Sequence, residues 1–220
     1  MNQNPLCSRT AGALAALVLV LFAVPSAALP VQFGFLGGIG IAKLRGPSSP
    51  LVEFKSLKAA AYGVTLRVPV GPALALEPEV LVVTDGLSYG ESDEVDGVGH
   101  VTGTTEFLHV LDRVQVPVLL RLTPPVPFAL RPFAFAGPWV AVRLREYQRV
   151  TGSTRLTASS RDLAAGDFGA TFGGGVQAKL GPGRAELQAR YDLGLGDLGD
   201  YLTTGSAHTG ALRVMAGWSF

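Results

Sequence analysis

The sequence predicts an all-β fold: one closed barrel of eight antiparallel strands in up-and-down order. Three observations lead to this fold class. Eight segments alternate apolar and polar residues with the period of two that a strand requires. The connections between these segments alternate between long and short. Finally, 28 Gly and 15 Pro in 220 residues are too many for a helical bundle, because Gly costs a helix about 1 kcal/mol and Pro about 3.

The N-terminal region is expected to be a cleaved secretory signal peptide, residues 1–28, that precedes the barrel domain at 29–220. A polar start with one cation, Arg9, leads into an uncharged apolar stretch at 11–24, and Pro25 and small residues follow it. This order of regions is typical of signal peptides, and the stretch is shorter than the roughly 20 residues of a membrane helix. The only cysteine, Cys7, lies in this segment, so no disulfide or cysteine-bound zinc is expected in the barrel domain.

The strand segments follow one another along the barrel domain, and the last two show the alternation most clearly. Between 185 and 193, Glu186, Arg190 and Asp192 point to one face, while Leu187 and Tyr191 point to the other. The eight segments are 31–44, 58–71, 73–84, 106–122, 128–144, 167–180, 184–195 and 208–220.

The connections indicate which kind of barrel the strands form. The long ones are 45–57, 85–105, 145–166 and 196–207, and the short ones are the turns at 71–72, 123–127 and 181–183. All long loops therefore fall on one end of the meander. Outer-membrane barrels have this asymmetry, with long loops outside and short turns in the periplasm. The segments also reach the 9–11 residues that a tilted strand needs to cross a bilayer.

One face of the strands is charged and the other is apolar. A soluble barrel would turn the charges outward and a membrane barrel inward, and the period alone leaves both open. Two features favour the transmembrane β-barrel. The apolar face repeats without the change of side-chain size that a filled core needs, and aromatic residues gather near strand ends, as in an interfacial girdle. These aromatic residues are Phe33, Phe128, Trp139, Tyr147, Phe168, Trp218 and Phe220.

In the transmembrane reading the charged residues form a network in the lumen. Eight strands leave an interior that side chains just fill, and buried charges require partners. We therefore expect a polar plug, with a narrow ion path as the alternative. The predicted lumen residues are Arg67, Glu77, Glu79, Arg121, Lys179, Glu186, Arg190, Asp192 and Arg213.

Four segments resemble the PorT-like family of small outer-membrane β-barrels, which is related in architecture to the OmpA and OmpX barrels. They are LEPEVLVV (76–83), VQVPVLLRL (114–122), RPFAFAGPWVAVRL (131–144) and the Gly-rich stretch from DFGATFGGG to GLGDL (167–198). Phe220 is similar to the C-terminal aromatic residue that serves such barrels as an insertion signal. The resemblance implies an eight-stranded outer-membrane barrel that is inserted by the barrel-assembly machinery, and it implies no activity.

Two loops carry residue types that are found in catalytic triads or in calcium-binding sites. His208 lies near Ser206 and Asp200, the types of a catalytic triad, but only proximity supports an enzyme at the outer rim. Loop 85–100 holds several carboxylates that Ca²⁺ would accept as ligands, without the spacing of a calcium-binding loop. These are Asp85, Glu91, Asp93, Glu94 and Asp96. We therefore expect no catalytic residue, no metal site and no cofactor.

The resulting expectation is a non-enzymatic barrel of the outer membrane with a structural or interaction role. Its partners would be outer-membrane lipids, the barrel-assembly machinery, and an unidentified ligand or protein at loops 85–105 and 145–166. The formal charge of +1 gives no basic surface for nucleic acid. A small passive pore and a lipid-modifying enzyme at the rim are the alternatives.

Overall fold

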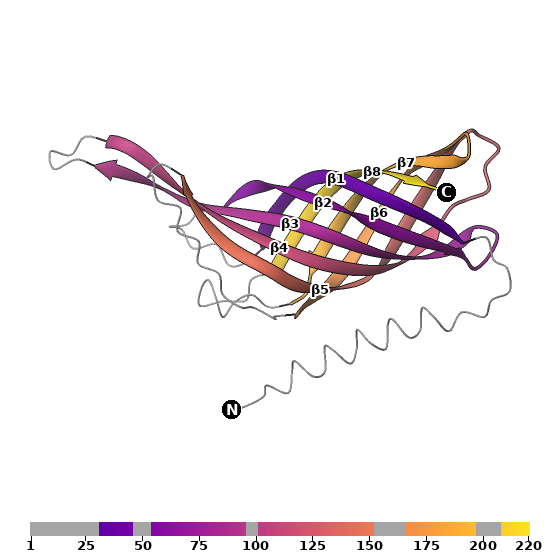
Figure 1. Ribbon diagram of the computed structural model, residues 1–220, viewed down its shortest axis with the longest axis horizontal. Coiled ribbons are helices and arrows are strands. Elements are labelled where there is room, and N and C mark those ends of the chain that lie inside the picture. The colour runs from indigo at the N-terminus through magenta and orange to yellow at the C-terminus, as the bar shows by residue number, and fades with distance from the viewer. Residues whose placement is uncertain (1–30, 46–53, 96–100, 152–165, 197–207) are drawn as a thin grey trace, which may run out of the picture.

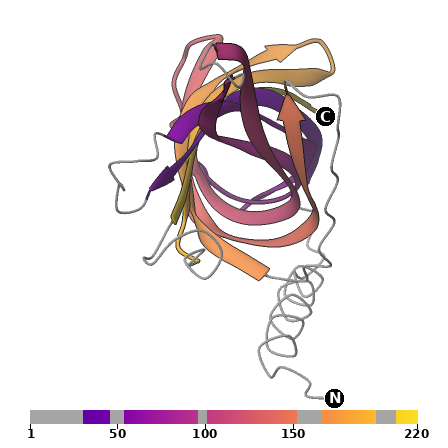
Figure 2. The ribbon, with the colours of Figure 1, turned by 90° about the vertical axis from the view of Figure 1, so that its left-hand side faces the viewer.

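The computed structural model describes residues 31–45, 54–95, 101–151, 166–196 and 208–220. These residues form one closed antiparallel barrel, seen from the side in Figure 1 and along its length in Figure 2. The strands are β1 (Gln32–Arg45), β2 (Phe54–Pro69), β3 (Leu74–Val95), β4 (Val101–Leu122), β5 (Leu130–Thr151), β6 (Gly166–Leu180), β7 (Gly183–Gly194) and β8 (His208–Ser219). The predicted eight-stranded up-and-down barrel is confirmed.

The barrel closes where the first strand meets the last. β1 pairs with β8 from Gly34 opposite Ser219 to Arg45 opposite His208. The Phe220 N–H then donates a hydrogen bond of 2.8 Å to the Phe33 carbonyl. Closure gives each strand two neighbours in the barrel wall, so the described part of the wall has no unpaired edge to meet lipid. Beyond the wall, residues 143–151 of β5 pair with β4 alone.

Three strands are longer than the sequence predicted by five residues or more. β3, β4 and β5 each have 22 residues, and they extend beyond the rest of the barrel at one end (Figure 1). The sequence analysis placed much of these extensions in the loops 85–105 and 145–166. The pairing continues there through polar residues, such as Asp93 opposite Thr104. Alternation marks a strand only where its two faces meet different surroundings, so it does not reveal the polar extensions.

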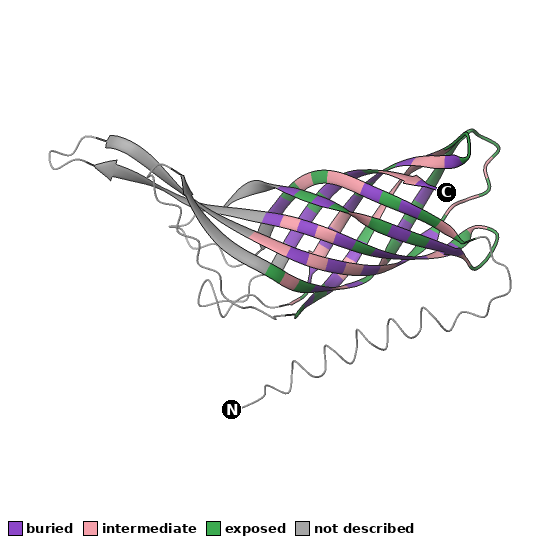
Figure 3. Cartoon of the chain, in the orientation of Figure 1, coloured by how far each residue is buried: buried purple, intermediate pink, exposed green. Residues whose placement is uncertain are grey.

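The strands place polar side chains inside the barrel and apolar ones outside. On β7, Glu186, Arg190 and Asp192 are buried, whereas Leu187 and Ala189 between them are exposed. Figure 3 shows the same alternation of buried and exposed positions along the other strands. This arrangement is the reverse of a soluble barrel and is the one expected where lipid surrounds the outer face.

The two ends of the barrel differ in the length of their connections. The short turns lie at the end where β8 finishes, which is also where the C-terminus lies (Figure 1). The tightest of them joins β6 to β7 through Gly181 and Pro182, and Gly181 has a φ of 58°. A positive φ at the first central residue is required by the type II′ hairpin turn, and Gly adopts it without strain. Short turns mark the periplasmic end of an outer-membrane barrel.

Within the residues that the structure describes, no helix has the length and apolar character needed to cross a membrane. The predicted signal peptide, residues 1–28, lies outside the described residues.

Candidate functional site

The lumen holds most of the charged residues that the sequence assigned to it. Eight of the nine predicted residues are buried. They are Arg67, Glu77, Glu79, Arg121, Glu186, Arg190, Asp192 and Arg213. They come from β2, β3, β4, β7 and β8, and the structure sorts them into three groups along the barrel.

The first group joins two arginines to two glutamates near the short-turn end. Arg67 lies 3.0 Å from Glu77 and 2.9 Å from Glu186. Arg121 lies 3.1 Å from Glu77 and 3.0 Å from Glu186. Each carboxylate thus accepts from both guanidinium groups, and the charges balance. Because β7 lies four strands from β3 in the closed order, this group spans the lumen from wall to wall.

Neighbouring side chains complete the first group. Thr65 donates a hydrogen bond of 3.0 Å to Glu77, and Arg121 donates one of 3.0 Å to the Gln177 amide oxygen. The Arg121 guanidinium lies 3.4 Å from the centroid of the Phe133 ring. A cation over an aromatic face is stabilised further. The Arg121 guanidinium is therefore held by hydrogen bonds from its N–H groups and by the Phe133 ring against its plane.

The second group is a single ion pair across the middle of the barrel. Arg190 on β7 binds Glu79 on β3 through two parallel hydrogen bonds of 2.7 and 3.0 Å. Such bidentate pairs are among the strongest hydrogen bonds in proteins. The Arg190 guanidinium also lies 5.3 Å from the Phe135 ring centroid. This pair forms a second bridge between opposite walls.

The third group lies toward the long-loop end and includes three residues that the sequence analysis missed. Arg113 binds Asp85 at 2.8 Å and Asp167 at 3.2 Å. Arg213 binds Asp85 and Asp192. The sequence analysis placed Asp85 in a loop because the alternation on β3 ends near it. Arg113 and Asp167 lie in predicted strands, and counting inward positions from Arg121 by two would have found Arg113.

Lys179 is the one predicted lumen residue that the structure places elsewhere. It is exposed at the periplasmic end of β6, opposite Arg184 in the register. Its side chain is on the inward face, as predicted. It lies two residues farther along β6 than Gln177, however, and so beyond the first ionic group. The prediction that it belongs to the paired network was wrong, because position along the strand, and not only the face, decides which charges meet.

Trp139 was also predicted wrongly, as part of the interfacial girdle. Its side chain is only 1% exposed, and the Arg113 guanidinium lies 5.0 Å from its ring centroid. It shares the inward face of β5 with Phe133, Phe135 and Ala141, which are also buried. Gly169 lies opposite it on β6 and leaves the space that its ring occupies. By contrast, Phe33, Phe128, Phe168 and Phe220 are exposed, at 52–67%.

The space at Gly169 gives a testable prediction. A Cβ atom there would lie 2.5 Å from the Trp139 ring and would also meet the Leu193 carbonyl oxygen. We expect Gly169→Ala to lower the free energy of unfolding in urea by about 1–3 kcal/mol, the usual cost of overpacking. Gly37→Ala is the matched control, because a Cβ at Gly37 meets nothing within 4 Å. Equal stability of the two variants would contradict the tight contact.

Several buried polar atoms between the ionic groups have no hydrogen-bond partner among the residues that the structure describes. Both amide atoms of Gln115 are in this state, as are the Nε atoms of Arg113 and Arg190 and the Nε2 of Gln188. Buried polar groups in folded proteins are normally satisfied by protein or by water. The section of lumen around Gln115 is therefore suited to hold water.

Most residues of the possible catalytic triad and of the possible calcium site lie in parts of the chain that the structure does not describe. Ser206, Asp200 and Asp96 lie outside the described residues, and the side chain of His208 is not described. No group of three or more potential metal ligands occurs among the described side chains. The calcium hypothesis for Asp85 is replaced by its ion pairs with Arg113 and Arg213.

The closed barrel, its apolar outer face and its charged interior define a small β-barrel of the bacterial outer membrane. The chain belongs to the family described as "Outer membrane protein beta-barrel domain", which matches residues 22–200. The protein is therefore located in the outer membrane. The narrower PorT-like family is not confirmed by this match.

Several solved structures of outer-membrane proteins are similar to the chain. The outer membrane protein OprG from Pseudomonas aeruginosa is similar with a TM-score of 0.50 and 8% identity, covering 87% of this chain and 97% of OprG. Ail of Yersinia pestis has a TM-score of 0.42 and 11% identity, over 86% of this chain and 99% of Ail. Neisserial surface protein A has a TM-score of 0.43 and 14% identity, over 84% and 95%. None of the curated proteins compared with the chain matches it. At such low identity, the similarity to OprG supports the architecture alone.

Proposed function

We propose that the protein is a non-enzymatic barrel with a plugged lumen, which anchors surface loops in the outer membrane for a structural or interaction role. The observation that carries the proposal is the ionic group of Arg67, Glu77, Arg121 and Glu186, which spans the lumen. An ion or solute would have to break these contacts in order to pass. Separating a buried charge from its partner costs several kcal/mol.

The three groups together close the lumen at three levels. Within the described residues the buried charges of the lumen are five arginines and six carboxylates, a net charge of −1 from 5 − 6. The arginines are Arg67, Arg113, Arg121, Arg190 and Arg213, and the carboxylates are Glu77, Glu79, Asp85, Asp167, Glu186 and Asp192. Each of these charges has an oppositely charged partner at hydrogen-bonding distance. Such mutual compensation favours a rigid core over an open channel.

Liposome swelling tests the proposal. Protein reconstituted in liposomes should admit glycine, arabinose and glucose no faster than protein-free liposomes do. A porin in parallel liposomes shows that the assay detects flux. Folded protein is verified by its faster migration on unheated gels, which reports a closed strand ladder. Swelling that depends on the amount of folded protein would overturn the plug and support a passive pore.

A narrow path for water or small ions is the second candidate. Gln115 supports it, because its two amide atoms are fully buried and have no hydrogen-bond partner in the described part of the chain. This section lies between the Arg190–Glu79 pair and the third ionic group. The second candidate predicts water permeation without sugar permeation, which stopped-flow light scattering of the same liposomes measures.

The PorT-like relationship and the insertion role of Phe220 are part of the same proposal. The four motifs at 76–83, 114–122, 131–144 and 167–198 support the first. The second is supported by the position of Phe220, which is 62% exposed at the periplasmic end. Its ring centroid lies 6.5 Å from that of Phe35 and 6.3 Å from that of Trp218.

Phe220→Asp should therefore reduce the amount of folded protein in the outer membrane. It removes two aromatic contacts, each contributing about 0.5–1.5 kcal/mol, and places a charge where the lipid interface is expected. Phe128→Asp is the control, since Phe128 is an exposed aromatic residue in the turn at the same end. The measurement is the heat-modifiable band in isolated outer membranes. Equal levels of the two variants would remove the support for an insertion signal at Phe220.

A further inference from the structure

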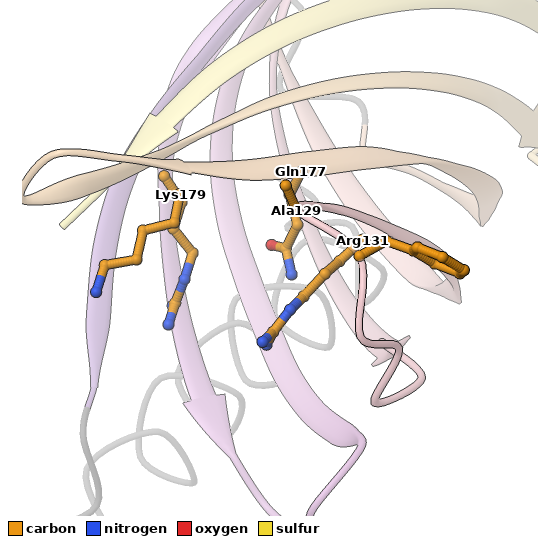
Figure 4. Close-up of a pocket in the computed structure, with 6 residues that line it drawn as sticks. Ala129, Arg131, Gln177 and Lys179 are labelled. Atoms are coloured by element: carbon orange, nitrogen blue, oxygen red, sulfur yellow. The ribbon is translucent and has the colours of Figure 1, made fainter.

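The periplasmic mouth of the barrel contains a small cavity whose charge the plug does not balance. The cavity has a volume of about 280 Å³ and is lined by Phe128, Ala129, Arg131, Gln177, Lys179 and Arg184. Figure 4 shows Lys179 and Gln177 of β6 and Arg131 of β5 projecting to the same side of the sheet. Ligand pockets for drug-sized molecules begin at about 300 Å³, so this one suits a small ion or headgroup.

The strand register explains why three cations meet at this point. Arg131 lies opposite Gln177, and Lys179 lies opposite Arg184. All four are at inward positions of their strands, because Phe133, Gln177 and Glu186 at neighbouring inward positions are buried. The cations therefore form a ring segment immediately outside the first ionic group.

No carboxylate compensates these three cations. None lines the cavity, and in the part of the chain that the structure describes, Arg131, Lys179 and Arg184 take part in no ion pair. Glu186, the nearest inward carboxylate on β7, is occupied by Arg67 and Arg121. The first group is neutral, so the mouth carries a net charge of +3. Lys179 and Arg184 are also like charges directly opposite each other, a destabilising arrangement in a sheet.

Gln177 adds a neutral donor to the floor of the cavity. It is 8% exposed, and its amide oxygen accepts a hydrogen bond from Arg121. The oxygen is thus directed at the plug, and the amide nitrogen is free to donate toward the cavity. Two guanidinium groups, an ammonium group and an amide N–H are all donors, which matches an oxygen-rich anion and excludes a cation.

We propose that this mouth, formed by Arg131, Gln177, Lys179 and Arg184, is a binding site for a phosphate group. Arginine binds phosphate through two parallel hydrogen bonds, and lysine adds a point charge. The group is carried either by a small soluble phosphate that enters from the periplasm or by the headgroup of an anionic phospholipid at the rim. A bound phosphate relieves the repulsion between Lys179 and Arg184. This site is independent of whether the lumen conducts.

Phosphate binding to the full chain tests the proposal in a detergent without phosphate, such as octyl glucoside. Isothermal titration calorimetry with inorganic phosphate and pyrophosphate should show one saturable site that weakens as salt is raised. Lys179→Gln combined with Arg184→Gln should raise the dissociation constant at least about tenfold, because charge-assisted hydrogen bonds are lost. Lys179→Arg should retain binding. Arg143→Gln removes one charge outside the cavity and should change the constant by less than about twofold.

The source of the phosphate is distinguished in nanodiscs. If the group belongs to a lipid, the ³¹P signal of phosphatidylglycerol should be perturbed by the wild-type protein and not by the double variant, while soluble phosphate binds weakly. If the group is a soluble phosphate, inorganic phosphate should bind to the protein equally well in phosphatidylcholine and in phosphatidylglycerol nanodiscs. Heat-modifiable migration verifies that each variant is folded. Absence of binding in both arms, or equal loss of binding in Arg143→Gln, would overturn the proposal.

Discussion

Removing either partner of the Arg190–Glu79 pair is expected to destabilise the barrel more than removing both. Glu79→Leu leaves the buried Arg190 guanidinium without its two hydrogen-bond acceptors, and Arg190→Met leaves the Glu79 carboxylate alone. Breaking a buried pair costs about 3–5 kcal/mol, whereas replacing the whole pair by apolar residues is often neutral or stabilising. Entry of water into the lumen would reduce the cost for the single variants.

Urea unfolding in lipid vesicles, followed by tryptophan fluorescence, gives the four free energies of this double-mutant cycle. Gln115→Leu is the control for placing an apolar side chain in the lumen. It should cost little, since neither amide atom of Gln115 has a partner within the described residues. The double variant should be more stable than either single variant. Additive losses would show that Arg190 and Glu79 do not depend on each other.

The second large effect is expected when Glu77 and Glu79 are both replaced by Ala. Glu77 accepts from Arg67, Arg121 and Thr65, and Glu79 accepts from Arg190. Of the buried lumen charges, five arginines and four carboxylates would remain, so the net charge would change from −1 to +1. The free energy of unfolding should fall by several kcal/mol, and any conductance that the variant gains should favour anions.

Melting of the folded band on gels and reversal potentials in a salt gradient measure the two effects. Gln188→Ala is the control for loss of side-chain volume, because Gln188 is buried on the inward face and forms no ion pair among the described residues. An unchanged melting temperature together with unchanged ion preference would mean that these carboxylates do not hold the plug.

The sequence revealed the fold and most of the site because the membrane imposes a strict alternation. Lipid surrounds one face of each strand, so the period placed Glu77, Glu186 and Arg213 on one charged face, and the features that favour a membrane barrel assigned that face to the lumen. The alternation stops where β3, β4 and β5 leave the apolar belt. For this reason the sequence analysis ended these strands too early and placed Asp85 in a loop.

What the sequence analysis missed depends on which strands face each other across the lumen and on how far along its strand each residue lies. Lys179 and Arg190 are both at inward positions, but only the closed barrel shows that Arg190 meets Glu79 across the lumen. Lys179 instead lies opposite Arg184, beyond the ionic groups. Trp139 resembled a girdle residue because aromatic residues prefer interfaces. Its burial depends on Gly169, which lies opposite on a strand that follows a long loop.

The conductance of the wild-type barrel in planar bilayers tests the central claim most directly. Arg67, Glu77, Arg121 and Glu186 span the lumen and compensate one another, so the folded protein should show no steady channel. The baseline should remain that of the lipid alone at moderate voltage, while the Glu77→Ala, Glu79→Ala variant measured in the same way should leak. A wild-type protein that conducts steadily in proportion to its folded amount would contradict the plugged lumen.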